Sequence, residues 1–373
     1  MNFSSRLPHG IQTNTLSQLL DAKRFAGTTV LDLTESNPTH AGIVYPEHFL
    51  DALADPRAAF YEPEPFGLPA ARERIAREYG ALSPKSVVMT ASTSEAYSWL
   101  FKLLCNPGDE VLVPRPSYPL FDYLAALESV VVRHYGLFYD HGAWCIDFHA
   151  LEQTLTDRTR AIVVVNPNNP TGHFIARGEL DQLTALCAQR GIAIISDEVF
   201  RDYALAARPE SALTLGGTSD ALTFTLHGLS KAVGLPQMKL AWMLASGPEA
   251  LVRDALLRLE MIADTYLSAG TPVQCALPSL LALREPVQQQ ILARLRQNLT
   301  YLLESGLRVL HVEAGWYAIV LHNEGDDFAE RLLRDRDLLV QPGYFYDFEG
   351  PGNLVLSLLT KHETFRSGVD RLR

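Results

Sequence analysis

The chain has 373 residues and a formal net charge of −11, because 43 Asp and Glu outnumber 32 Lys and Arg. Apolar residues make up 47% and charged residues 20%, which is typical of a globular protein. The length predicts two or three domains. Because no basic stretch could follow a phosphate backbone, neither nucleic acid nor an anionic membrane is expected as a main partner.

The four cysteines are scattered and form no CxxC pair, which predicts free thiols in a reducing compartment. No apolar run reaches the about 18 residues that a membrane helix needs. The N-terminus also lacks the apolar core of a signal peptide. We therefore expect a cytoplasmic protein, and no motif predicts a metal site.

Along the chain, short β-branched runs alternate with helical stretches from residue 86 onward. Strands buried on both faces are expected at 86–90, 110–113, 130–133, 161–165, 192–196, 222–226 and 240–245. Helices are expected between several of them, at 94–105, 117–127 and 177–190. This alternation predicts an α/β fold with a mostly parallel sheet sandwiched by helices.

After residue 248 the pattern changes. Long helices are expected at 249–264 and 285–304, a shorter one at 326–334, and strands at 316–322 and 354–358. This mixture predicts a second, smaller α+β domain. We place the large domain at 46–265 and build the small domain from both chain ends, 1–45 and 266–373.

Polar residues follow several predicted strands, at the edge where ligands bind in α/β sheets. Ser92 and Glu95 have the spacing of a capping box, so the start of this helix is either only a cap or a phosphate site. Asn169 lies in an Asn/Pro/Gly segment that is first of all a turn, although its position also allows the amide to point into the crevice.

Two charged residues follow the next strands. Asp197 is either a helix cap or the partner of a buried cation. Lys231, one of only six lysines, lies in a short apolar loop. It is either a solvated loop residue or a buried amine whose lowered pKa makes it a nucleophile that forms imines. An anion site, an amide, a carboxylate and a lysine on one edge are what a phosphorylated aldehyde cofactor needs.

Three motifs occur in a specific order, at 168–172 (NNPTG), 196–200 (SDEVF) and 228–231 (GLSK). With them the chain resembles, over almost its whole length, the class I/II aminotransferases, which are fold type I pyridoxal-phosphate enzymes. The resemblance implies that the large domain binds pyridoxal 5'-phosphate. Lys231 would form the imine with it, Asp197 would pair with its pyridine nitrogen, and Asn169 would donate to its phenolic oxygen.

The same resemblance implies further cofactor contacts. Tyr118 matches the aromatic residue that stacks on the pyridine ring. The residues that match the phosphate shell are Ser92, Thr93, Ser94, Ser230 and Lys239. Tyr61 resembles the tyrosine that reaches the phosphate of the neighbouring subunit, so a homodimer is implied.

Several positions depart from the family pattern. Phe200 stands where a tyrosine usually shares the hydrogen bond to the phenolic oxygen, and Lys239 stands where an arginine is usual. The family often has a glycine at the position of Ser92 and a serine at that of His227. His227 is expected either to contact phosphate or to pack.

A further departure concerns the substrate. Val355 stands where the family normally has an arginine that clamps the α-carboxylate by two hydrogen bonds. Either the carboxylate is held otherwise, or the substrate has none near the reacting carbon. Candidate replacements are Lys361, Arg366, Tyr344 and Tyr346, and the alternative for the two tyrosines is packing between the domains. Asn37 either contacts the substrate or forms the turn before Pro38.

The expected function is amino transfer from a donor to a keto or aldehyde acceptor by a ping-pong mechanism. Lys231 would be the general base, and Asp197 would stabilise the carbanion. Because the carboxylate clamp is missing, a lyase, decarboxylase or racemase on the same fold is the alternative. A non-catalytic sensor domain is a third hypothesis, disfavoured by the intact set of Lys231, Asp197 and Asn169.

Overall fold

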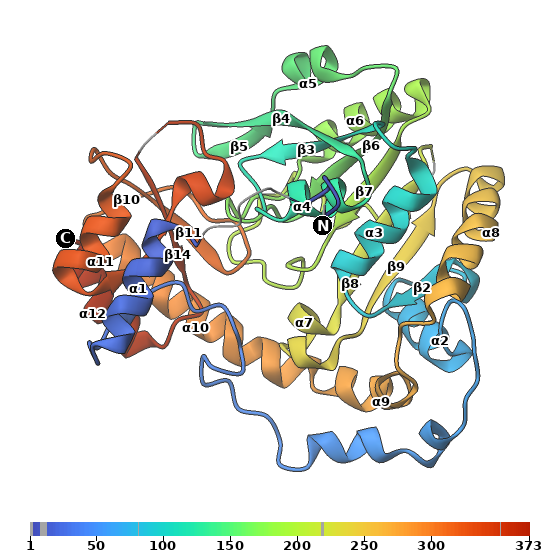
Figure 1. The fold of residues 1–373 in the computed structure, drawn as a ribbon, viewed down its shortest axis with the longest axis horizontal. Helices are drawn as coiled ribbons and strands as arrows, with labels where there is room; N and C mark the ends of the chain where they lie inside the picture. Colours follow the sequence, from blue (N-terminus) through green and yellow to red (C-terminus); the bar gives the residue numbers. More distant parts are fainter. Residues whose placement is uncertain (1–2, 8–12, 81, 218–219, 351) are drawn as a thin grey trace.

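The computed structural model describes residues 3–7, 13–80, 82–217, 220–350 and 352–373 (Figure 1). Its largest sheet has the strand order β2-β9-β8-β7-β6-β3-β4-β5. These strands are Val87–Thr90 (β2), Glu110–Arg115 (β3), Val131–Asp140 (β4), Ala143–Ile146 (β5), Thr159–Val165 (β6), Ala193–Asp197 (β7), Thr223–Gly228 (β8) and Ala241–Ser246 (β9). From β8 to β4 the neighbours run parallel, whereas β9 and β5 pair antiparallel.

The mostly parallel sheet expected from the sequence is therefore confirmed, with two differences at one edge. β4 continues seven residues beyond its predicted end at Arg133, and β5 was not predicted. Along β4 most side chains are exposed or half-buried. A strand of this kind does not give the continuous apolar run by which the central strands were recognised.

Helices cover both faces of this sheet, as its side-chain alternation requires. On β3, Val111 and Val113 pack with α3 (Thr93–Leu104) and α8 (Glu249–Tyr266), whereas Leu112 packs with α6 (Arg177–Arg190) and α5 (Phe148–Thr154). α4 (Phe121–Leu127) lies on the first face beside α3. The helix predicted at 117–127 begins only at Phe121.

A smaller antiparallel sheet is built near the C-terminus in the order β10-β11-β14-β13. Its strands are Arg308–Val309 (β10), Tyr317–Leu321 (β11), Gln341–Pro342 (β13) and Asn353–Ser357 (β14). The helices around it are α10 (Arg284–Glu304), α11 (Phe328–Arg336) and α12 (His362–Leu372). This part of the chain combines helices with a small sheet, which confirms the second, smaller α+β unit expected from the sequence.

Both ends of the chain meet in this second part. β1 (Leu31–Asp32) pairs parallel with β12 (Leu338–Leu339), and α1 (Thr15–Phe25) packs on α11 (Figure 1). The limits 46–265 for the large domain stay a prediction. α9 (Thr271–Ala282), which that division assigns to the small domain, packs against α2 (Pro69–Glu78) and the 3-10 segment η1 (Phe49–Ala54). Within the described residues, no helix is both long and apolar enough to cross a membrane.

The turn after β6 approaches the small part closely at Gly172. Its φ is +72°, and a Cβ there would lie 2.4 Å from the backbone oxygen of Ala314. Because a backbone oxygen cannot rotate away, we expect Gly172→Ala to lower the free energy of unfolding. The cost is about 1–2 kcal/mol for the left-handed backbone and about 1–3 kcal/mol for the clash.

Gly191→Ala is the matched control. Gly191 has φ +65° and nothing within 4 Å of its Cβ position. Gly191→Ala should therefore lose only the free energy that the left-handed backbone costs. Thermal and urea unfolding of both variants measures the difference. Equal losses would show that the turn can move away from Ala314.

Candidate active site

A cavity of about 380 Å³ lies at the edge of the large sheet where β6, β7 and β8 end. Val165, Asp197 and Gly228, the last residues of these three strands, all line it. Because the strands are parallel neighbours, their carboxyl ends meet at one edge, as ligand sites of open α/β sheets require.

Ten of the predicted cofactor residues line this cavity. They are Ser92, Thr93, Ser94, Tyr118, Asn169, Asp197, Phe200, Ser230, Lys231 and Lys239. Ser36, Tyr97 and Tyr317, which sequence reasoning missed, line it as well. Tyr97 lies one helical turn after Ser94, and that i, i+3 spacing is the signal by which it could have been found.

Asp197 is buried at the end of β7 with two donors on its carboxylate. The Tyr97 hydroxyl donates to Oδ2 at 3.1 Å, and the Val199 N–H donates to Oδ1 at 3.2 Å. Burial raises the pKa of Asp197 from 3.8 to about 6, although both hydrogen bonds and the charge of Lys231 oppose this shift. A carboxylate that two hydrogen bonds fix in place can pair with a ligand cation or a protonated nitrogen.

Lys231 lies in the short helix α7 (Leu229–Ala232), directly after β8. Its Nζ is 4.4 Å from the ring centroid of Trp316 and 5.2 Å from that of Phe200. Burial lowers the pKa of this amine from 10.5 to about 8, and the charge of Asp197 offsets part of the effect. At neutral pH a larger fraction of such a lysine is unprotonated, so it is more available as a nucleophile or general base than an exposed lysine.

The start of α3 is capped by Ser92, and it opens onto the cavity. Ser92 is the N-cap, and its Oγ accepts the Glu95 N–H at 3.1 Å, while Glu95 accepts the Ala91 N–H at 2.7 Å. The cap residue and the first two helical residues, Thr93 and Ser94, also line the cavity. A 12-residue helix with its N-terminus at a cavity presents N–H groups and a positive dipole end to an anion.

The polar groups of the cavity fit pyridoxal phosphate. Asn169 lines the cavity with its Oδ1 buried and without a hydrogen-bond partner in the described chain, and the Nδ2 of the same amide is the donor that a phenolic oxygen requires. Nζ of Lys231 lies near the rings of Trp316 and Phe200. Three adjacent strand ends supply an amine, an amide and a carboxylate, and a helix N-terminus lies next to them. These groups are what the aldehyde, the ring and the phosphate of the cofactor require. Lys231, Asp197, Asn169, Tyr118 and the residues at the start of α3 are therefore those that would hold it.

Several predicted substrate residues lie elsewhere. Lys361 is exposed at the N-cap of α12, and the Arg366 guanidinium lies 5.3 Å from the ring centroid of Tyr301. Tyr344 is 47% exposed and packs against Phe345. None of these lines the cavity. The structure does not bring these three residues to the cavity of this chain, because α12 and the 3-10 segment η5 (Gly343–Tyr346) place them elsewhere.

The remaining candidates are near the cavity or on the surface. The Oδ1 atom of Asn37 accepts the N–H of Thr39 at 3.1 Å, so its side chain forms the turn, while the preceding Ser36 lines the cavity. Tyr346 is buried with its ring centroid 6.3 Å from that of Tyr317. Tyr61 is 79% exposed and lies outside the cavity of its own chain.

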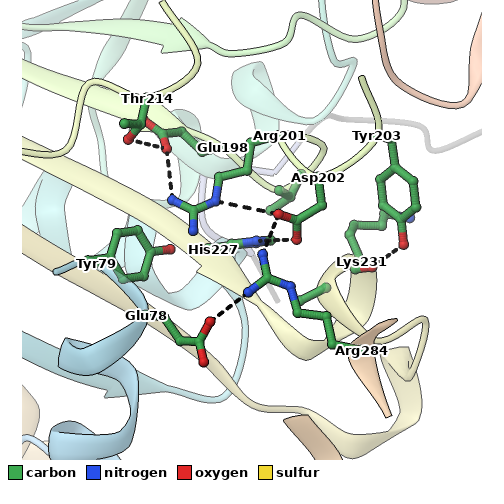
Figure 2. A network of polar contacts seen from close by, with 12 residues as sticks. Glu78, Tyr79, Glu198, Arg201, Asp202, Tyr203, Thr214, His227, Lys231 and Arg284 are labelled. Carbon is green, nitrogen blue, oxygen red and sulfur yellow. Dashed lines mark hydrogen bonds and ion pairs between the residues drawn. The ribbon is translucent and has the colours of Figure 1, made fainter. Parts of the chain in front are cut away.

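His227 belongs to a buried polar network behind the cavity (Figure 2). Its Nε2 is 3.2 Å from Oδ2 of Asp202, which also pairs with Arg284 at the start of α10. The side chain does not line the cavity, so packing is its role here. Next to this network the Tyr203 hydroxyl donates to the backbone oxygen of Lys231 at 2.6 Å, which fixes the backbone at the reactive lysine.

One group of possible metal ligands, Asp122, His134 and Asp347, occurs in the described part of the chain. None of the three lines the cavity.

The raised pKa of Asp197 predicts how stability depends on pH. In the cofactor-free protein the native state binds the proton of Asp197 more tightly than the unfolded state does. Tighter binding of this proton in the native state adds to the free energy of unfolding below about pH 4, and this contribution is lost as the pH rises through about 6. Asp197→Asn removes the buried charge while keeping an oxygen for Tyr97. It should therefore raise the free energy of unfolding at pH 8 by about 3 kcal/mol, from a shift of about two units at about 1.4 kcal/mol each.

Urea unfolding at pH 4 and pH 8 measures this effect, and the advantage of the variant should vanish at pH 4. Asp122→Asn, at an exposed carboxylate, is the control and should change little at either pH. A variant that is no more stable than wild type at pH 8 would contradict the assignment of a costly buried charge to Asp197.

Comparisons with known proteins agree with this geometry. The model of the family "Aminotransferase class I and II" matches residues 28–372. The glutamate-pyruvate aminotransferase AlaA of Escherichia coli K12 is 32% identical over 271 residues, which cover 70% of this chain and 66% of that protein. The match thus spans slightly less than two thirds of the relative's length. Human tyrosine aminotransferase is 28% identical over 359 residues, covering 88% of this chain and 77% of its own.

Solved structures show the same fold. An aminotransferase from Escherichia coli superposes with a TM-score of 0.87 at 24% identity, covering 100% of this chain and 97% of that one. Aspartate aminotransferase from Thermotoga maritima gives a TM-score of 0.84 at 25% identity, covering 99% and 98% of the two chains. This chain therefore belongs to the class I and II aminotransferases, a family of fold type I enzymes that use pyridoxal phosphate.

Proposed function

We propose that this protein is a pyridoxal-phosphate-dependent aminotransferase that moves an amino group from a donor to a keto or aldehyde acceptor by a ping-pong mechanism. The observation that carries the proposal is that Asn169, Asp197 and Lys231 line one cavity from the exits of three neighbouring parallel strands. The named relatives act in amino transfer but differ in their printed substrates, which include glutamate, pyruvate and tyrosine.

Each residue has a separate task in this proposal. Bound pyridoxal phosphate supplies an electron sink next to the reacting carbon. Asp197 would hold the pyridine nitrogen in its protonated form, and Asn169 would donate to the phenolic oxygen. Nζ of Lys231 would anchor the cofactor and, when free, would act as the general base that takes and gives back the proton of the donor's reacting carbon.

The other cavity residues position the cofactor. Tyr118 would lie against the pyridine ring, while the start of α3, Ser230 and Lys239 would hold the phosphate. We extend the proposal to a homodimer in which Tyr61 reaches the neighbouring site. Tyr61 is 79% exposed and the neighbouring Phe60 is 68% exposed, and two adjacent exposed aromatic side chains support a contact with another subunit. The free cysteines support a cytoplasmic location.

A lyase or decarboxylase on the same fold is the alternative. The observation that favours it is that an apolar residue, Val355, stands at the position of the expected carboxylate clamp.

A donor screen tests amino transfer. A competent donor should change the absorbance of the bound cofactor, release keto or aldehyde product equal to the number of sites, and leave a form that an acceptor returns to the original spectrum. Lys231→Ala should keep the fold but lose the product by at least about 10³-fold, since the general base is gone. Lys102→Ala, at a surface ion pair with Glu128, is the control. Carbon dioxide release without amino transfer would instead support the decarboxylase.

The ring of Phe200 gives a second prediction. Phe200 lines the cavity without a hydroxyl, so in Phe200→Tyr a new donor can reach the phenolic oxygen of the cofactor. A hydrogen bond to the phenolate form, of about 1 kcal/mol, should lower the pH midpoint of the cofactor's absorbance by somewhat less than about one unit. A pH titration measures the midpoint. Phe200→Leu, which adds no donor, should not lower it, and an unshifted midpoint in Phe200→Tyr refutes the prediction.

A further inference from the structure

The small sheet forms one wall of the cavity, and its register shows which side chains belong to that wall. Tyr317 of β11 lines the cavity and lies opposite Ser357 of β14, and Ile319 lies opposite Val355. Residues directly opposite each other in antiparallel strands share a face, as do residues two apart in one strand. Val355 therefore belongs to the face of the sheet that carries Tyr317, where it is fully buried and does not itself line the cavity.

The charge of this wall does not suit a carboxylate. Among the described residues that line the cavity, the cations are Lys231 and Lys239, and both come from the large part and serve the cofactor. Glu35 lies close enough to Tyr317 that its charge adds to burial in raising the pKa of the Tyr317 hydroxyl. Glu35 accepts the N–H of Asn37 at 2.8 Å, and the exposed His40 is 3.7 Å away.

Neutral hydrogen-bonding groups stand on this wall instead. The Tyr317 hydroxyl interacts with the side chain of Ser36, which lines the cavity. Close to Tyr317, the Tyr346 hydroxyl donates to Oε1 of Gln341, and Gln341 is the cross-strand partner of Val355. Burial raises the pKa of both tyrosines, so their hydroxyls stay uncharged at neutral pH.

Arginines near the small sheet are engaged elsewhere. Nε of Arg115 donates to the backbone oxygen of Asp347 at 2.9 Å, and Nη1 of Arg294 donates to that of Ala41 at 3.2 Å. Neither side chain lines the cavity. A carboxylate beside Tyr317 would lose its hydration close to Glu35, and the described residues of this chain that line the cavity offer no cation there that would offset the cost.

We infer that the compound that gives up its amino group in this cavity is a primary amine with no carboxylate on the carbon that bears the nitrogen. The inference rests on the proposed function and names its donor class. Tyr317 and Ser36, which line the cavity on the side of the small sheet, meet uncharged polar groups such as hydroxyls on this amine, and the apolar Val355 shares the sheet face of Tyr317.

Two matched probes test this inference on the holoenzyme. tert-Butylamine and 2-methylalanine differ by a methyl group in place of the carboxylate, and neither has a hydrogen on the reacting carbon, so neither can start amino transfer by losing a proton. Carbon dioxide release is measured alongside, because loss of the carboxylate is the route left to 2-methylalanine. Titration of each, followed by the absorbance of the bound cofactor, gives a Kd. We expect tert-butylamine to bind at least tenfold more tightly. Equal or tighter binding of 2-methylalanine, or binding of neither probe, overturns the inference.

A pair of variants locates the effect. Val355→Arg should shift the ratio of the two Kd values at least tenfold toward 2-methylalanine, because a guanidinium can pair with its carboxylate. Val355→Met adds bulk without charge and should leave the ratio near that of wild type. If Val355→Arg folds and the ratio does not move, this face of the small sheet does not select the donor, and the inference is overturned. If Val355→Arg does not fold, the wild-type ratio alone decides.

Failure of the proposed function gives a different result. A holoenzyme that binds tert-butylamine more tightly than 2-methylalanine, but transfers no amino group from isopropylamine or any other donor, refutes amino transfer and leaves the preference for amines intact. A holoenzyme that transfers amino groups only from 2-amino acids supports the proposed function and overturns the inference.

Discussion

The structure depends on removing two opposite charges from water at the ends of adjacent parallel strands. Asp197 ends β7 and Lys231 follows β8, and burial moves the pKa of each toward its neutral form, to about 6 and about 8. Desolvation thus outweighs the attraction between them. This costs stability in the free protein and prepares both groups for a ligand that has an aldehyde and a basic ring nitrogen.

The surrounding fold limits the cost and fixes the geometry. Tyr97 donates to Asp197, and the ring of Trp316 lies near the amine of Lys231. Behind the strands, Asp202 joins His227 of β8 to Arg284 of α10, so the helix that leads into the small part is tied to the large sheet (Figure 2). A buried ion network of this kind is weak evidence for stability, but removing one partner leaves an uncompensated charge.

The two parts of the chain contribute different properties to one cavity. The large sheet and α3 supply the cations, the amide and the helix N-terminus, and so the means to hold a phosphorylated cofactor. The small sheet supplies Tyr317 and the apolar surface around Val355, with Glu35 nearby. In the proposed function, the large sheet and α3 hold the cofactor, whereas the proposed donor preference rests on the small sheet. A substitution on the small sheet is therefore expected to change the donor and to leave the cofactor-binding groups in place.

The sequence by itself determined the elements with a strong local signal. The buried strands are continuous apolar runs, and the residues at their exits, such as Asn169 and Lys231, could be named because parallel strands end at one edge. Only the tertiary structure decided which distant segments complete the cavity. It brings in Ser36 and Tyr317 and leaves Lys361 on the surface, because these positions follow from the pairing of chain ends hundreds of residues apart, and no local pattern encodes that pairing.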